Sequence, residues 1–305
     1  MKKFEIRKLI KEEIKNFIKE AGDTVLGKET PIGLSKIKTD TANDVVGGGL
    51  EDEDKSDDMV SGKKDSFAVG NLRPAQTEII KEKAFGMAVN FILDNNYNNA
   101  DLEAIVSNDS NPYIMDGHHR WAATSLIDPK AKVQATQIDL PGGPLVTALN
   151  LFTKGKLGIS QGNKGKGNVA EFTGKNLSVV IDNALKNGTP GEYGKSAEEV
   201  KTALEKMPGA GGNADTGKAI MMKNADKLPK QKMPGAPARV EMPVIDEKKV
   251  AIVKSMLEKG ALDIAPPYSD EVKAAIGVSK EKEVEKEKEE VAESKRWQKL
   301  AGITK

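Results

Sequence analysis

Residues 112–129 read PYIMDGHHRWAATSLIDP and contain both histidines of this 305-residue chain. The apolar run PYIM predicts a buried strand, and Asp116-Gly117 after it predicts a tight turn. The following ten residues predict a helix, which Asp128-Pro129 ends. We expect its large apolar residues to face inward; these are Trp121, Leu126 and Ile127. A strand, a glycine turn and a helix therefore follow one another here.

The turn between this strand and helix is a candidate anion-binding site. The first N–H groups of a helix lack partners within the helix, and the helix dipole favours a negative charge there. Arg120 adds a planar guanidinium that suits phosphate oxygens. His118 and His119 are adjacent and cannot share one helix face, so one can face the anion while the other orients Asp116 or packs. Either histidine could act near neutral pH as an acid, a base or a metal ligand.

A metal site at this turn has less support from the residue pattern. Asp116 is the candidate ligand, and His118 and His119 are ligand types as well. The chain has no third histidine, and the spacing matches no zinc pattern.

Residues 66–140 form the predicted core. FAVGNL (67–72) predicts a short strand, and EIIKEKAFGMAVNFILDN (78–95) predicts a helix. DLEAIVSN (101–108) and KVQATQIDL (132–140) complete the stretch around the central turn. We therefore expect an α+β fold with a small mixed core of sheet and helix.

The segments before this core differ sharply in composition. Residues 1–22 carry apolar side chains at spacings of three and four, which predicts an amphipathic leader helix. Residues 23–65 show no sustained period and include the acidic run EDEDKSDD, so we interpret them as a disordered acidic linker.

Three further regions follow the core. Residues 141–206 predict a helical accessory region, in which Ser196 and Glu199 form a capping box at the start of one helix. Residues 207–245 are rich in Gly, Pro and Ala and predict a flexible loop, and residues 246–305 predict C-terminal helices. Within the loop, GNADTGK (212–218) fits the spacing of a P-loop, but Ala219 replaces the required Ser or Thr and no strand precedes it.

Composition limits the possible partners. The net charge of +1 gives no global attraction to nucleic acid or to anionic lipid, so such contact requires a local patch. The best local candidates for nucleic-acid backbone contact lie in or just before the basic glycine loop GNKGKGNV (162–169); they are Lys154, Lys156, Lys164 and Lys166. The chain has no cysteine, and no apolar run approaches the roughly 20 residues that span a bilayer, so we expect no membrane partner and a cytoplasmic location.

Two boxes together resemble the ParB/sulfiredoxin-like superfamily, most closely its ParB-like nuclease branch. They are LRPAQTEI (72–79) and IMDGHHRWAA (114–123), and the resemblance covers a quarter of the chain. It implies that Gly117, His118, His119 and Arg120 line nucleotide phosphates, and that Asp116 contacts a hydroxyl, a metal or a nucleophile. It also implies that the first box faces the same pocket through three residues, of which the last could serve as a base: Arg73, Gln76 and Glu78.

The resemblance implies several activities. Relatives hydrolyse phosphodiesters or transfer phosphate, which suggests nucleic acid or a nucleotide (ATP, ADP or CTP) as partner and Mg²⁺ as a possible cofactor. The chain lacks the catalytic cysteine of sulfiredoxins, which excludes their reaction, and shows no helix-turn-helix segment after the box, which argues against a partition role.

The ends suggest an alternative. FIKEA (17–21) and LIKEE (9–13) resemble sites cut by tailed-phage prohead proteases, and the C-terminal RWQKLAGI resembles marine phage proteins. On this interpretation the chain is a noncatalytic virion or internal head protein, which uses the fold as a scaffold and contacts phage head proteins through its terminal helices. The two interpretations are compatible, because an enzyme in the host cytoplasm can also be packaged in a virion.

Overall fold

The computed structural model describes residues 62–159, 167–243 and 247–258, together with Gly162 and positions 31, 33–37, 39 and 42. The expected leader helix at 1–22, both cleavage-like sites and the expected terminal helix beyond 258 lie outside the described residues. Among the helices that are described, none combines the length and the apolar character needed to cross a membrane.

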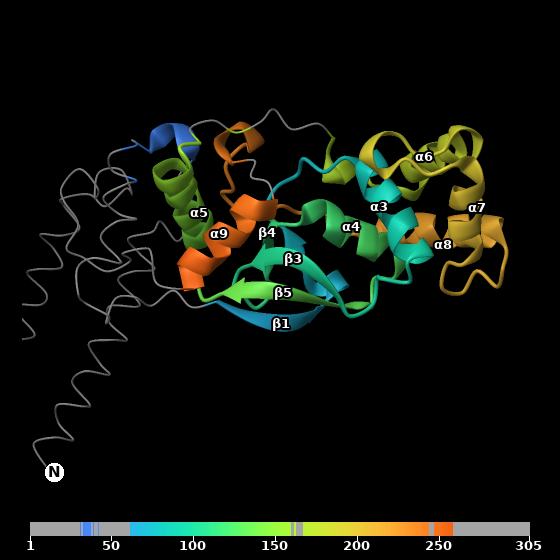
Figure 1. Ribbon diagram of the computed structural model, residues 1–305, viewed down its shortest axis with the longest axis horizontal. Coiled ribbons are helices and arrows are strands. Elements are labelled where there is room, and N and C mark those ends of the chain that lie inside the picture. Colours follow the sequence, from blue (N-terminus) through green and yellow to red (C-terminus); the bar gives the residue numbers. More distant parts are fainter. Residues whose placement is uncertain are drawn as a thin grey trace, which may run out of the picture.

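A five-stranded mixed sheet lies at the centre of the molecule (Figure 1). Its strands are β1 (Gly62–Ala68), β2 (Arg73–Pro74), β3 (Ala100–Val106), β4 (Tyr113–Asp116) and β5 (Lys132–Ile138). Their order is β1-β5-β3-β4-β2. The outer pair β1/β5 and the inner pair β3/β4 are antiparallel, whereas β3/β5 and β4/β2 are parallel. The chain is thus a mixed α and β protein, as the sequence predicts.

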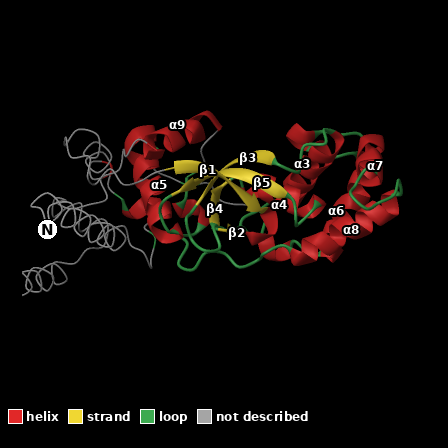
Figure 2. Ribbon diagram, turned by 90° about the horizontal axis from the view of Figure 1, so that it is seen from below, coloured by secondary structure: helices red, strands yellow, loops and turns green. Residues whose placement is uncertain are grey.

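Helices cover both faces of the sheet because neighbouring residues of a strand point to opposite faces. In β4, Ile114 packs into one hydrophobic cluster and Met115 into the other. The first cluster joins the sheet to α3 (Lys81–Leu93), α4 (His118–Ile127), α6 (Gly174–Asn187), α7 (Ala197–Glu205) and α8 (Ala214–Lys227). The second joins it to α5 (Gly142–Leu157) and α9 (Glu247–Glu258). Figure 2 shows these two groups of helices on opposite sides of the sheet.

The strand, turn and helix expected around residue 117 are confirmed. β4 ends at Asp116, α4 spans His118–Ile127, and the C-cap N–H of Asp128 bonds the carbonyl of Thr124. Trp121 is fully buried, and its indole N–H donates to the carbonyl of Val69 at 2.9 Å. This bond ties α4 to the 3₁₀ turn η2 (Val69–Asn71) that follows β1. The capping box of Ser196 and Glu199 at the start of α7 is also confirmed.

The expectation of a flexible loop at 207–245 is wrong for much of that segment. Residues Ala214–Lys227 form α8, capped by the Asn213 side chain, which accepts the N–H of Thr216. Gly217 lies inside this helix at the point where α7 crosses it. The crossing leaves no room for a side chain, because an added Cβ would lie 2.0 Å from the carbonyl oxygen of Leu204. The P-loop spacing at 212–218 therefore marks a helix start and a close helix crossing.

The boundary of the expected linker at 23–65 also changes. β1 begins at Gly62, and the 3₁₀ turn η1 (Leu34–Lys36) packs against α5 with Leu34 and Ile37 buried. No local periodicity marks this turn, because its two apolar residues gain their burial from α5, more than 100 positions away in the chain. The expected accessory region 141–206 likewise divides, since α5 packs in the second cluster and α6 and α7 in the first.

Candidate functional site at the start of α4

Gly117 sets the geometry of the turn. It is the N-cap of α4 with φ 89°, in the left-handed region that glycine adopts at little cost. An added Cβ would lie 2.9 Å from Cβ of Ala104, so the turn packs closely against β3. The first bond of the helix runs from the N–H of Trp121 to the carbonyl of Gly117. The N–H groups of His118, His119 and Arg120 therefore have no acceptor within the helix.

His118 lines a small pocket, and its ring is neutral. His118 is 4% exposed, and burial, with smaller electrostatic contributions from His119 and Arg239, lowers its pKa to about 3. The amide Nε2 of Gln76 lies 3.3 Å from Nδ1 of the ring. An amide nitrogen can only donate, so Nδ1 accepts and the single ring proton lies on Nε2. No described residue accepts a hydrogen bond from this buried N–H.

His119 points away from this pocket, toward the start of α3. Its Nε2 accepts the N–H of Ile80, the N-cap residue of α3, at 3.0 Å. Its neutral ring therefore carries the proton on Nδ1. One histidine thus faces the pocket, while the other joins the N-termini of two neighbouring helices.

The pocket beside His118 is narrow, with a volume of about 60 Å³. Its polar lining comes from four distant parts of the chain: Gln76, Asp116 with His118, Asn150 with Thr153 on α5, and Arg239. Its walls are apolar and come from Ile105, Met115, Val146, Leu149, Met242 and Pro243. Small-molecule pockets usually measure about 300–1,000 Å³. This one therefore has room for a phosphate-sized group but not for a nucleoside.

The charges around the pocket are mixed. Burial raises the pKa of Asp116, against the opposing effect of Arg120, whose Nη2 lies 3.4 Å from the Asp116 carboxylate. Burial lowers the pKa of Arg239, and the carboxylates of Glu78 and Asp116 oppose this change. Arginine remains charged in proteins, so the pocket combines a fixed cation with a carboxyl group that holds its proton more readily than usual.

A second group of charges lies behind Asp116. Arg120 also contacts Glu103, and Lys254 of α9 donates to the carbonyl of Glu103 at 2.9 Å. Glu103 has φ 48°, which is strained for a residue other than glycine, at a register shift in β3. Arg120 is thus held on the outer side of the turn, and it does not line the pocket.

The first sequence box divides between the pocket and other sites. Gln76 lines the pocket, and the carboxylate of Glu78 acts to raise the pKa of the Arg239 guanidinium. Arg73 lies elsewhere: its Nη1 donates to the carbonyls of Gly70 and Leu72 and so closes the turn η2. The expectation that Arg73 faces the phosphate pocket is therefore wrong, because its guanidinium closes the turn η2 and Arg73 does not line the pocket.

Arg239 is the charged pocket residue that the sequence interpretation missed; the polar residues Asn150 and Thr153 were missed as well. Arg239 belongs to the 3₁₀ turn η5 (Arg239–Glu241), within the segment expected to be a flexible loop. One signal was present: the chain has only five arginines among its 47 basic residues, so an arginine in a loop stands out. Arginine suits oxyanion recognition better than lysine because its donors form a planar fork.

Metal ligands are sparse around the turn. Among the described residues, no group of three or more His, Asp or Glu side chains could hold a metal ion. Asp116 offers one carboxylate between two arginines. This is a poor cage for an ion held by protein alone, but Mg²⁺ commonly binds through one carboxylate together with substrate phosphates.

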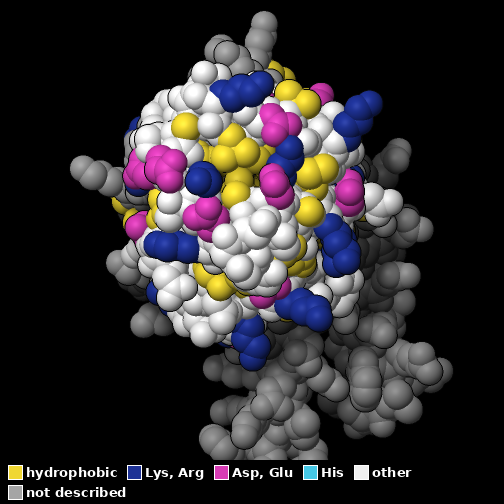
Figure 3. All heavy atoms as spheres, turned by 90° about the vertical axis from the view of Figure 1, so that its right-hand side faces the viewer, with side chains coloured by type: hydrophobic (Ala, Val, Ile, Leu, Met, Phe, Trp, Pro, Cys, Tyr) yellow, Lys and Arg dark blue, Asp and Glu magenta, His cyan; other side chains and the backbone are white. Residues whose placement is uncertain are grey.

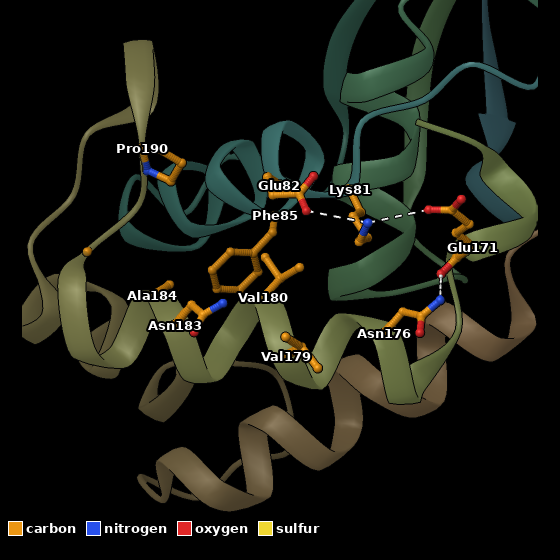
Figure 4. Close-up of a pocket in the computed structure, with 11 residues that line it drawn as sticks. Lys81, Glu82, Phe85, Glu171, Asn176, Val179, Val180, Asn183, Ala184 and Pro190 are labelled. Carbon is orange, nitrogen blue, oxygen red and sulfur yellow. Dashed lines mark hydrogen bonds and ion pairs between the residues drawn. The ribbon is translucent and has the colours of Figure 1, made fainter. Parts of the chain in front are cut away.

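A larger cavity lies between α3 and α6, with a volume of about 530 Å³ (Figure 4). Its floor is apolar and includes Phe85 and Val180. Its charged rim is satisfied internally, because Lys81 pairs with Glu82 and Glu171 at 3.4 Å each. We therefore place the candidate site at the smaller pocket, where the buried Nε2–H of His118 has no acceptor in the part of the chain that the structure describes.

The expected nucleic-acid contacts in the glycine loop lose one member. Lys154 is 8% exposed, and its ammonium donates to the carbonyl of Leu34 at 3.0 Å. It is therefore a structural cation, and Lys164 and Lys166 lie outside the described residues. At the end of the molecule that carries α6 to α8, basic and acidic side chains alternate over the surface (Figure 3). This end of the molecule therefore does not present the uniformly positive surface that binds nucleic-acid phosphates.

Comparisons with known proteins give no family assignment. No family model, no curated protein and no solved structure matches the chain.

Proposed function

We propose that this chain is a ParB/sulfiredoxin-like enzyme that binds the phosphate of a nucleotide or nucleic acid at the β4–α4 turn. One observation carries the proposal: His118 lines a phosphate-sized pocket, and its buried Nε2–H has no acceptor among the described residues. An unmatched buried donor costs about 1–3 kcal/mol, a cost that an oxyanion in the pocket would remove. Arg239 supplies the balancing positive charge.

The proposed roles follow from charge and position. His118 binds phosphate oxygen as a neutral donor, since a pKa of about 3 makes it a poor base near neutral pH. Asp116 is the better proton acceptor, because burial raises its pKa and it lines the same pocket. In hydrolysis, Asp116 takes the proton of a water that attacks phosphorus as the bond to the leaving oxygen breaks. Mg²⁺ carried in with the phosphate would meet the same carboxylate.

The size of the pocket favours one substrate class. An internal phosphate of a strand needs space for chain on both sides, whereas a terminal phosphate enters with one ester link at the mouth. A volume of about 60 Å³ with apolar walls suits the terminal group. We therefore favour a nucleotide over an intact strand, and phosphate transfer or hydrolysis over internal cleavage of nucleic acid.

The test compares two arginines by titration calorimetry with phosphate, ATP, ADP, CTP and a DNA duplex, each with and without Mg²⁺. Arg239→Gln should weaken phosphate binding by about 10- to 100-fold, the value of a charged hydrogen bond. Arg73→Gln is the matched control and should leave the affinity unchanged, because Arg73 bonds only backbone outside the pocket. Wild-type protein that binds none of these ligands would refute the proposal.

A further inference from the structure

Arg239 reaches the pocket from a turn that has little structure of its own. η5 has three residues, and no strand lies between α8 and α9 in the described chain. The Nη1 of Arg239 donates to the carbonyls of Met242 at 2.8 Å and Pro243 at 3.0 Å. The direction of the guanidinium therefore depends on the conformation of residues 239–243, and short 3₁₀ turns are weak when isolated.

The turn is held from outside, chiefly through Glu241. The side-chain carboxylate of Glu241 accepts the N–H of Ser35 at 2.8 Å. The backbone carbonyl of Glu241 accepts a hydrogen bond from the side-chain amide of Asn150 on α5 at 3.3 Å. The neighbouring carbonyl of Val240 accepts the N–H of Gly162 at 3.0 Å. Gly33 lies so close that an added Cβ would be 2.7 Å from the Glu241 carboxylate oxygen.

We call residues 33–37 the strap. Both apolar residues of the strap are buried: Ile37 belongs to the second hydrophobic cluster and is 1% exposed, and Leu34 is 0% exposed. Lys154 fixes its backbone through the carbonyl of Leu34. The N–H of Ser35 lowers the pKa of Glu241, with smaller contributions from Lys36 and Lys154. The strap thus presents a fixed donor to one carboxylate of η5.

We propose that Glu241 is a positioning residue, which the strap clamps so that Arg239 stays directed into the pocket. The inference rests on the proposed function of that pocket and assigns a role to a segment far outside the strand–turn–helix unit. Glu241 does not line the pocket, so we expect its effect on a bound anion to pass chiefly through the turn that carries Arg239.

The first measurement needs no ligand. Amide hydrogen exchange of Ser35 and of residues 236–243 should accelerate by about tenfold or more in Glu241→Ala, because the bond that closes the clamp is lost. Glu241→Gln keeps an acceptor oxygen and should exchange like wild type. Glu205→Ala, on the exposed face of α7, is the matched control and should change nothing. Unaltered exchange in Glu241→Ala, or equal acceleration in Glu241→Gln, overturns the proposal.

The second measurement is a double-mutant cycle with inorganic phosphate as the probe. Glu241→Ala should weaken binding by about tenfold, as the loss of a supporting residue typically does. In the Arg239→Gln background the same change should add nothing, because the arginine it positions is gone. An equal loss in both backgrounds would mean that Glu241 acts otherwise and would overturn the proposal.

A second variant approaches the clamp from the strap. Gly33→Ala should displace the Glu241 side chain and reproduce the faster exchange of residues 236–243 without changing Glu241 itself. A matching effect supports the clamp, and slow exchange in this variant contradicts it. Wild-type protein that binds no phosphate but shows these exchange effects would refute the proposed function while leaving the clamp in place.

Discussion

Replacement of Gly117 by alanine tests whether the β4–α4 turn is as constrained as its geometry indicates. The backbone at this position has φ 89°, and a left-handed conformation costs a residue with a Cβ about 1–2 kcal/mol. The new methyl would also lie 2.9 Å from Cβ of Ala104, which is closer than real Cβ contacts. Overpacking of this kind costs about 1–3 kcal/mol. Gly117→Ala should therefore lower the free energy of unfolding by about 2–5 kcal/mol.

Gly158→Ala separates the two contributions. Gly158 is the C-cap of α5 with φ 63°, and an added Cβ there meets nothing within 4 Å. This control should lose only the conformational cost of about 1–2 kcal/mol. Urea unfolding followed by circular dichroism gives both values, with the slope m compared between variants to check that the unfolding transition is the same.

The steric part can be isolated with Ala104→Gly. In the double variant with Gly117→Ala the clash is removed, so the two changes should show a favourable coupling of about 1–3 kcal/mol. The reasoning fails if Gly117→Ala costs no more than Gly158→Ala. It also fails if Ala104→Gly does not restore stability to Gly117→Ala, because the loss would then not come from contact with the Ala104 side chain.

Three further changes test other parts of the molecule. The pKa of His118 in the folded chain lies below its ordinary value of 6.5, so on acidification the unfolded chain takes up this proton first. The free energy of unfolding should therefore fall by roughly 4 kcal/mol from its value above pH 6.5 as the pH approaches 3. His118→Asn should remove this contribution to the pH dependence of stability, which urea unfolding measures. Lys154→Met should cost about 1–3 kcal/mol, since Leu34 loses a buried donor, yet leave DNA affinity unchanged in a filter-binding assay. Gly217→Ala should lower the melting temperature although alanine favours helices, because the methyl would meet the carbonyl of Leu204; a rise would contradict the close crossing of α7 and α8.

Local sequence patterns predicted the elements whose causes are local. The boundaries of α4 follow from Gly117 before it and Asp128-Pro129 after it, and the start of α7 follows from its capping box. α8 was missed because Gly217 within it and the glycines before it (Gly209, Gly211 and Gly212) favour a loop locally, although its Ala, Met and Lys residues favour a helix. It forms because Gly217 allows α7 to approach, and this contact brings together residues that the local pattern does not connect.

The candidate site shows the same division. The sequence identified Asp116 and the two histidines, because a strand, a glycine turn and a helix start follow one another directly. It could not distinguish the roles of His118 and His119, since these depend on Gln76 and Ile80, about 40 positions earlier in the chain.

The sequence by itself determined a mixed α and β chain with a tight glycine turn between β4 and α4, because each of those features depends on residues within one or two turns of backbone. Only the tertiary structure decided which charged groups meet there. Arg239 lines the pocket because η5 packs against α5 and the strap, while Arg73 closes the turn η2 and does not line the pocket. Contacts between distant segments are set by the packing of the two cores, and no local pattern records that packing.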